Sequence, residues 1–160
     1  MVSTWLNSLA PTPFIAKAAY FAGGSGPVTT VDKFAFADDS RSTLGTGLSS
    51  AREQLAGAAN SGTAAYFAGG STGSRVTTVD KFAFTDDSRT TLATGLSVAV
   101  GHLAGAANSG TAAYFAGGVG VGIVTTVDKF AFSDDSRTTL ATGLSAGRNS
   151  LAGAANSGTL

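Results

Sequence analysis

The sequence contains no cysteine and a single histidine among its 160 residues. Missing cysteine excludes disulfides, thiolate metal sites and cysteine nucleophiles, and it leaves the redox compartment undetermined. One histidine without cysteine does not supply the three or four ligands that a zinc site needs. It also offers no Ser-His-Asp arrangement in a motif context. We therefore expect no metal site and no cofactor.

The chain also lacks an excess of charge of either sign, with ten basic and ten acidic residues. Without a basic stripe, the attraction that drives binding to nucleic acid or to an anionic membrane is missing. No apolar run approaches the roughly 18 residues of a membrane-spanning helix. No signal peptide is recognisable at the N-terminus. The compartment stays open, although a place outside a cell or on a particle, reached by lysis or assembly, is our expectation.

What the sequence does contain is repetition. The segment YFAGG starts at Tyr20, Tyr66 and Tyr114, and VTTVDKFAF occurs three times, at 28–36, 76–84 and 124–132. DDSR follows each copy, and then STLGTGL or TTLATGL. Periods of about 40 to 50 residues are typical of propeller blades or helical arrays. Short runs of Val, Thr, Phe and Ala between Gly-, Asn- and Asp-rich turns favour strands over helices.

Each unit therefore predicts four antiparallel strands, in LAGAANSGT, AAYFAGG, VTTVDKFAF and TLATGL. NSGT and DDSR are expected to form turns. The resulting fold class is all-β, with β-propeller blades of four antiparallel strands and three blades in the chain. The predicted organisation is a non-repeat segment at 1–17, repeats at 18–54, 55–102 and 103–150, and a closing strand at 151–160.

The pattern of Tyr-Phe-Ala-Gly-Gly, a short loop, a Val-rich strand and then an Arg resembles the kelch repeat. In that family the Gly-Gly pair ends the second strand, and an Arg often precedes the first strand of the next blade, as Arg52 and Arg148 do here. The resemblance extends over 17–160. The chain departs from it at Leu44, Leu92 and Leu140, where kelch repeats carry a Trp, and at Val100, which stands in the place of the Arg.

A second, weaker resemblance lies in SDDSRTTL at 133–140. This segment is similar to the Asp-box of sialidase-type propellers, a hairpin between the third and fourth strands. Arg137 replaces the Gly of that box and Leu140 replaces its Trp. The box is structural in its own family, so the resemblance implies no sialidase activity.

The order of strands within the repeats predicts self-association. We number the four expected strands of a unit in the order LAGAANSGT, AAYFAGG, VTTVDKFAF and TLATGL. The sequence then runs 2-3-4, 1-2-3-4, 1-2-3-4 and 1, so the first unit lacks its strand one and the last strand one lacks a unit. Pairing of 151–160 with 18–24 of another copy would complete the first blade and cover an exposed sheet edge. Two chains would then form six blades, our preferred homo-oligomer. Nine blades from three chains and an open stack of hairpins are the alternatives.

Residues 1–17 lie outside the repeats and contain the only tryptophan, Trp5. One interpretation is that Trp5 and Phe14 pack over a blade and seal it. The other is that the segment docks the protein to a larger assembly.

Comparison of the repeats with one another locates the variation. It is confined to the connections between strands two and three and between strand four and the next strand one. In a propeller these connections share one face, and loops on a rigid scaffold commonly bind ligands. The predicted ligand-binding residues are Ser25, Gly26, Pro27, Arg52, Glu53, Gln54, Ser71, Thr72, Ser74, Arg75, His102, Arg148 and Asn149. A glycan or a cell-surface protein is the expected partner; neutral loop variation is the alternative.

Three Asp pairs, at 38–39, 86–87 and 134–135, are the remaining candidates for chemistry. Paired carboxylates can hydrolyse glycosides or bind calcium. Their recurrence before Ser and Arg in every repeat favours a turn device instead. We therefore expect a non-catalytic structural or adhesive module, for example part of a viral tail or surface appendage. A glycosidase or lyase using the Asp pairs and a pure oligomerisation scaffold are the alternatives.

Overall fold

The computed structural model describes residues 18–156, which form β-strands, turns and loops and contain no helix. The all-β class expected from the repeats is confirmed for this part of the chain. The strands are β1 (Ala18–Ala22), β2 (Val31–Ala35), β3 (Arg41–Thr43), β4 (Ala56–Asn60), β5 (Ala64–Ala68), β6 (Val79–Ala83), β7 (Arg89–Thr91), β8 (Ala104–Asn108), β9 (Ala112–Ala116), β10 (Val127–Ala131) and β11 (Arg137–Thr139). The predicted segment 1–17 and the last four residues of the predicted closing strand lie outside the described residues.

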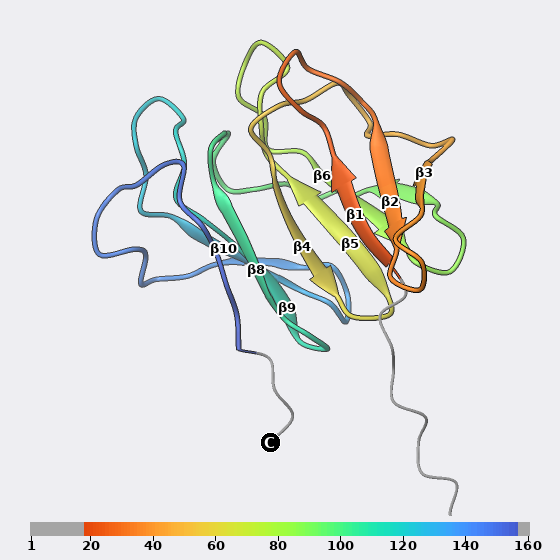
Figure 1. Cartoon of the computed structure of the whole chain (residues 1–160). Helices are drawn as coiled ribbons and strands as arrows, with labels where there is room; N and C mark the ends of the chain where they lie inside the picture. The colour runs from red at the N-terminus through yellow and green to blue at the C-terminus, as the bar shows by residue number, and fades with distance from the viewer. Residues whose placement is uncertain (1–17, 157–160) are drawn as a thin grey trace, which may run out of the picture.

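The strands form three antiparallel sheets, one for each repeat (Figure 1). The first sheet has the order β1-β2-β3, the second β4-β5-β6-β7 and the third β8-β9-β10-β11. The second and third sheets thus contain four strands each, whereas the first contains three. The sheets are not closed into a ring, and β1 is the edge strand of the first sheet.

The turns within each sheet follow from local chemistry. Asn60 and Thr63 close the β4–β5 hairpin, in which the Thr63 N–H donates to the Asn60 carbonyl at 3.0 Å. At the β6–β7 turn, Asp87 has a φ of 58°, in the left-handed region that Asp and Asn tolerate better than most residues. Equivalent aspartates in the other two repeats have the same conformation. Both predicted turn sequences are therefore found as turns.

The fourth strand differs from its prediction. Instead of TLATGL, the strand begins at the arginine of DDSR and ends after three residues, as in β7. Leu92 still donates its N–H to the Val79 carbonyl, and the chain then bends at residues 93 and 94. The bend lets Leu96 N–H reach the Thr77 carbonyl at 2.7 Å and buries the Leu96 side chain. Burial of this leucine ends the strand early, together with an approach of Gly95 to the Thr77 carbonyl that a Cβ would prevent.

The core lies between successive sheets. Val31 and Phe82 belong to one buried cluster, between the first and second sheets. Val79, Phe115 and Phe130 belong to the other, between the second and third sheets. Phe82 and Phe130 have no exposed surface at all. Each sheet is therefore stabilised by apolar burial against its neighbours in the stack.

The innermost strands of successive sheets stack through glycine. Strand β8 lies beside β4 (Figure 1), and a Cβ at Gly105 would collide with the Gly57 carbonyl oxygen. A Cβ at Gly153 would likewise collide with the carbonyl oxygen of Gly105. Residues 151–156 form no strand, yet they run along β8 as β8 runs along β4. Only glycine permits backbones to approach this closely.

Candidate functional site

The variable connections meet at one end of the three sheets. We call the six segments 25–27, 50–54, 71–75, 98–102, 119–123 and 146–150 the variable loop surface. Backbone bridges join Glu53 to Ser71 and Gly101 to Val119 within it. At the opposite end, the invariant turns contact one another, and the Ser61 N–H donates to the Ser109 hydroxyl at 3.1 Å. The structure thus separates variable from constant sequence in space.

The predicted binding residues differ in their accessibility. Seven are exposed, namely Ser25, Gly26, Pro27, Thr72, Ser74, Arg148 and Asn149. Glu53, Gln54, Arg75 and His102 are half-buried, and Arg75 donates a hydrogen bond to the Gln54 side chain. Ser71 is buried, and its hydroxyl accepts a hydrogen bond from the Gly73 N–H. The loop surface therefore presents fewer side chains than its sequence indicates.

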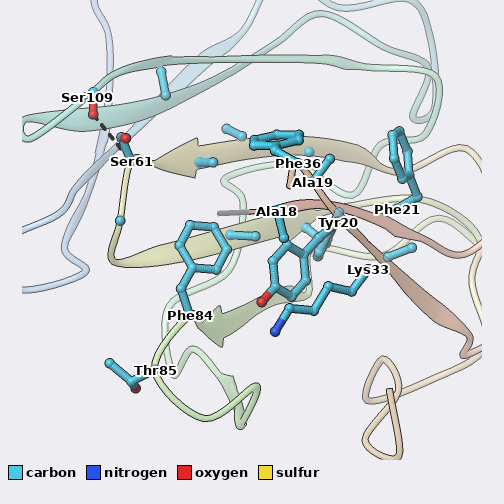
Figure 2. Close-up of a pocket in the computed structure, with 18 of the residues that line it drawn as sticks. Ala18, Ala19, Tyr20, Phe21, Lys33, Phe36, Ser61, Phe84, Thr85 and Ser109 are labelled. Carbon is cyan, nitrogen blue, oxygen red and sulfur yellow. Dashed lines mark hydrogen bonds between the residues drawn. The ribbon is translucent and has the colours of Figure 1, made fainter. Parts of the chain in front are cut away.

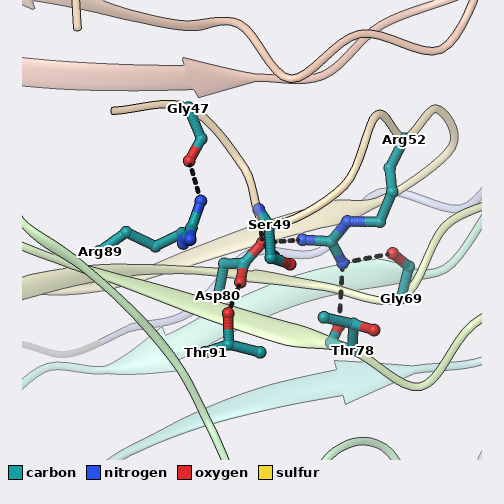
Figure 3. Close-up of polar contacts among 8 residues, drawn as sticks. All are labelled: Gly47, Ser49, Arg52, Gly69, Thr78, Asp80, Arg89 and Thr91. Carbon is teal, nitrogen blue, oxygen red and sulfur yellow. Dashed lines mark hydrogen bonds and ion pairs between the residues drawn. The ribbon is translucent and has the colours of Figure 1, made fainter. Parts of the chain in front are cut away.

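Arg52 is not available at the surface. It is fully buried, and its guanidinium donates to the carbonyl oxygens of Gly69 and Thr78, both at 2.9 Å (Figure 3). The same group forms an ion pair with Asp80 at 2.5 Å. Burial lowers the pKa of Arg52, and the Asp80 carboxylate opposes that shift. Its role as a ligand-binding residue is therefore wrong for this structure, because it fastens a loop to the second sheet.

Asp80 accepts further hydrogen bonds from a neighbouring loop and from strand β7. The N–H and the hydroxyl of Ser49 both donate to it at 2.9 Å, and the Thr91 hydroxyl donates at 2.6 Å (Figure 3). Asp128 in the third sheet is held in the same way by Ser97 and Thr139.

In the sequence, Asp80 and Asp128 adjoin Lys81 and Lys129, which suggests ion pairs between blades. In the structure Asp80 pairs with Arg52 instead, and Lys81 pairs with Asp135. Repetition of the aspartate inside VTTVDKFAF, at a position that faces the core, is the signal for its buried role.

The Asp pairs act in turns and between sheets. Asp86 accepts the Ser88 N–H at 3.0 Å, and hydrogen bonds from Ser88 lower the pKa of its carboxyl. Its neighbour Asp87 accepts hydrogen bonds from Tyr20 and Lys33 of the first sheet, with Lys33 at 2.8 Å. Each member of the pair thus has a structural partner.

The same connection recurs one sheet further along. Tyr66 and Lys81 of the second sheet donate to Asp135 of the third at 2.7 Å each. Burial, reinforced by Asp135, raises the pKa of Tyr66 well above its usual value. Both tyrosine rings also contact a phenylalanine of the next sheet, Tyr20 with Phe84 and Tyr66 with Phe132. One set of polar and aromatic contacts therefore joins every consecutive pair of sheets.

Three exposed apolar side chains in the variable loops were not among the predicted binding residues. Val121 is fully exposed, Ile123 is 55% exposed and Val98 is 38% exposed. In the second repeat the segment equivalent to 119–123 is STGSR, which is polar. The apolar residues of VGVGI at 119–123, in a loop otherwise made of glycine, are a signal for the exposure of Val121 and Ile123.

A groove of about 1040 Å³ runs along β1 (Figure 2). Its walls come from β1, from β4 and β5 of the second sheet, and from the end of β8. Tyr20 and Phe84 stack on one side of it, with ring centroids 4.9 Å apart, while Phe21 and Phe36 line it elsewhere. Small side chains, mainly alanine, form most of the remaining surface. The groove is therefore apolar, and one side of it is an open sheet edge.

The equivalent positions of the other sheets are filled. Phe21 is 61% exposed, but its equivalents Phe67 and Phe115 are only 6% and 2% exposed. Phe67 is covered by Gly57 of β4, and Phe115 is covered by Gly105 of β8. The groove thus lies where an innermost strand would cover β1.

Comparison of the chain with models of protein families and with curated proteins finds no match. Within residues 18–156 no helix is long and apolar enough to cross a membrane, and no cluster of three acidic or histidine side chains could hold a metal ion.

Proposed function

We propose that the protein is a non-catalytic structural module, a divergent kelch-like propeller unit, that presents the variable loop surface to a partner. The observation that carries this proposal is the separation of variable loops from constant turns at opposite ends of the sheets. Repeated hydrogen bonds between sheets fix the scaffold, so the loops can change without altering it. A larger particle, such as a viral tail or surface appendage, is the setting that such a module fits.

A protein surface is the partner that the loops favour over a glycan. Val98 of the second repeat and Val121 and Ile123 of the third expose apolar area. Loss of such area from water stabilises protein interfaces, whereas recognition of a sugar depends chiefly on hydrogen bonds. The polar loop residues of the first two repeats would then form the rim of the contact.

The test is adhesion of the labelled protein to a panel of whole cells. Adhesion is measured before and after protease treatment of the cells, and binding to a glycan array is measured alongside. We expect saturable adhesion that protease removes and that Val121→Ser with Ile123→Ser weakens. A matched control is Thr138→Ser, at an exposed strand position away from the loops. Binding to a glycan on the array, with no loss of adhesion after protease treatment, would show that the partner is a glycan and not a protein. Adhesion that is unchanged in the loop variants, or no adhesion at all, would overturn the proposal that the variable loop surface binds a partner.

The enzyme alternative is tested separately. Asp38, Asp86 and Asp134 each accept the N–H of the second residue after them, and an asparagine side chain can accept it as well. The triple Asp→Asn variant should therefore fold. Hydrolysis of a glycoside panel by the parent protein, lost in this folded variant, would contradict the non-catalytic proposal.

A further inference from the structure

We propose that the groove along β1 binds residues 151–155 of a second copy, so that the third sheet of one chain joins head to tail to the first sheet of the next. Sequence identity points to this occupant, because LAGAA at 151–155 is identical to residues 55–59 and 103–107, which contain most of β4 and β8. Those two segments already cover β5 and β9 in the same chain. This inference is independent of what the loop surface binds.

The inserting segment is already held in the required position. The N–H of Gly118 donates to the Arg148 carbonyl at 2.7 Å, as the N–H of Gly70 does to the Val100 carbonyl at 2.8 Å. Ser150 has a φ of 51°, close to the 56° of its equivalent His102. The chain before residue 151 is therefore folded as though a further sheet followed, although residues 18–156 contain none.

Strand register in the other sheets defines the expected pairing. Ala58 pairs with Tyr66, and Ala106 pairs with Tyr114. The same register places Ala154 of one copy opposite Tyr20 of the next, and Gly153 opposite Phe21. Gly153 would then cover Phe21 as Gly57 covers Phe67. Gly57 contacts Gly105 on one side and lines the groove on the other. The carbonyl of Gly153 would lie against Gly57 on the groove side and so continue the stack of glycines into the next copy.

Two donors next to the segment have matching acceptors at the open edge. Arg148 is the equivalent of Arg52, yet it is exposed and makes no side-chain hydrogen bond within residues 18–156. In the joint its guanidinium would reach Asp32 and two carbonyls of the next copy, as Arg52 reaches Asp80. Ser145 would donate to the same aspartate, as Ser49 does to Asp80.

Asp32 is ready for this exchange. At present it forms an exposed ion pair with Arg41 at 3.2 Å and accepts the Thr43 hydroxyl at 2.6 Å. In the second sheet the arginine equivalent to Arg41 instead donates to the Gly47 carbonyl of the preceding sheet. In the joint, Arg41 would donate in the same way to the Gly143 carbonyl of the other copy. The Asp32 carboxylate would then be free to pair with Arg148 of that copy.

A third set of contacts closes the outer part of the joint. Tyr114 and Lys129 lack the aspartate that their equivalents have, and Asp39 makes no side-chain hydrogen bond or ion pair within residues 18–156. Asp39 has a φ of 55°, close to the 58° of Asp87 and Asp135, which accept from tyrosine and lysine. Tyr114 and Lys129 of one copy would bind Asp39 of the next, and Phe36, now 54% exposed, would lie against the Tyr114 ring.

The two surfaces are thus complementary in charge as well as in shape. Lys129 and Arg148 lie on the third-sheet side, and Asp32 and Asp39 lie on the first-sheet side. Because the two surfaces differ, the contact is heterologous, and successive copies form a ring or an open filament. A face-to-face dimer would instead oppose like charges.

The test is the mass of the full chain by light scattering on a sizing column. We expect wild type to run at a multiple of the 15.7 kDa chain mass. A tail-blocked variant, Lys129→Asp with Arg148→Glu, and a head-blocked variant, Phe21→Asp with Asp39→Lys, should each be monomers, with association weakened on the order of 30-fold or more. Ser74→Asp, an exposed change in the second repeat and so outside the joint, should leave the mass as in wild type.

Mixing the two blocked variants provides the decisive result. Each keeps one intact surface, so the mixture should form one-to-one pairs that do not grow further. No pairing in the mixture, although both variants remain folded by circular dichroism, would overturn the head-to-tail joint. Wild type that is monomeric at every concentration would overturn it too. Slow amide exchange at β1 in such a monomer would identify another segment of the same chain as the occupant.

Discussion

The segment AAYFA forms both β1 and β5, and the two copies have different surroundings. All five residues of β5 are buried, whereas none of the five residues of β1 is. Both strands pair with a VDKFA strand in the same register. The difference arises because β5 has β4 on its other edge and β1 has an open groove there.

Identical strands therefore differ in stability through their neighbours. Local sequence specifies the strand, its turn and its pairing, and the adjacent innermost strand determines how much apolar area leaves water. Equivalent substitutions in the first and second sheets therefore measure this contribution directly. They are best compared at concentrations where the chain is monomeric.

The largest effect is expected for the core phenylalanines. Phe82→Ala removes a ring with no exposed surface and should lower the free energy of unfolding by about 3–5 kcal/mol. Phe34→Ala removes the equivalent, half-buried ring of the first sheet and should cost clearly less. Urea denaturation of both variants measures the difference. Equal losses in the monomer would show that the first sheet is already covered.

A loss nearly as large is expected at the buried ion pair. Asp80→Ala leaves Arg52 buried without its carboxylate and should destabilise the fold by about 3–5 kcal/mol. Asp32→Ala removes an exposed ion pair of the first sheet and should have a small effect. Thermal unfolding followed by circular dichroism tests both. A large loss of thermal stability in Asp32→Ala would contradict this expectation and show that the exposed ion pair with Arg41 stabilises the first sheet.

A moderate effect is expected at the tyrosines. Tyr66→Phe removes a hydroxyl that donates to Asp135 and should cost about 1 kcal/mol. Tyr114→Phe removes the equivalent hydroxyl, which makes no hydrogen bond within residues 18–156, and should leave monomer stability unchanged. Comparison of denaturation midpoints distinguishes the two. In an assembled sample, where Tyr114 would donate to Asp39 of the next copy, the Tyr114→Phe variant should also be less stable than wild type.

The smallest effect concerns acid pH. Hydrogen bonds from Ser40, Ser88 and Ser136 lower the pKa values of Asp38, Asp86 and Asp134 below the usual 3.8. Their contribution to stability is therefore complete above about pH 4 and is lost as the pH falls through the lowered values. The triple Asp→Asn variant should have a flatter stability profile between pH 4 and pH 2 than wild type. Superimposable profiles would contradict this role.

The sequence predicted much of the fold because the strands and turns depend on nearby residues. NSGT and DDSR form turns as expected, and the second and third repeats each form a four-stranded sheet. The short fourth strand was not foreseen, since it depends on the burial of Leu96 beneath the next loop.

Positions that depend on distant contacts were not accessible from the sequence. Arg52 and Arg148 have equivalent places in their repeats, but one is buried against Asp80 and the other is exposed. Only the presence of a following sheet separates them. The same limit applies to the β1 groove, whose apolar lining comes from several strands far apart in the sequence.

The glycine contacts between Gly57, Gly105 and Gly153 have a consequence for how such a chain can evolve. The contact between Gly57 and Gly105 joins the second and third sheets through backbone alone, and Gly153 repeats it against Gly105, so this part of the docking surface needs no matched side chains. A duplicated unit of 48 residues, the spacing of these glycines, would dock onto the last by the rule that docked its parent. A change in unit number would therefore need no compensating mutation at these glycine contacts, and chain length could change in whole steps.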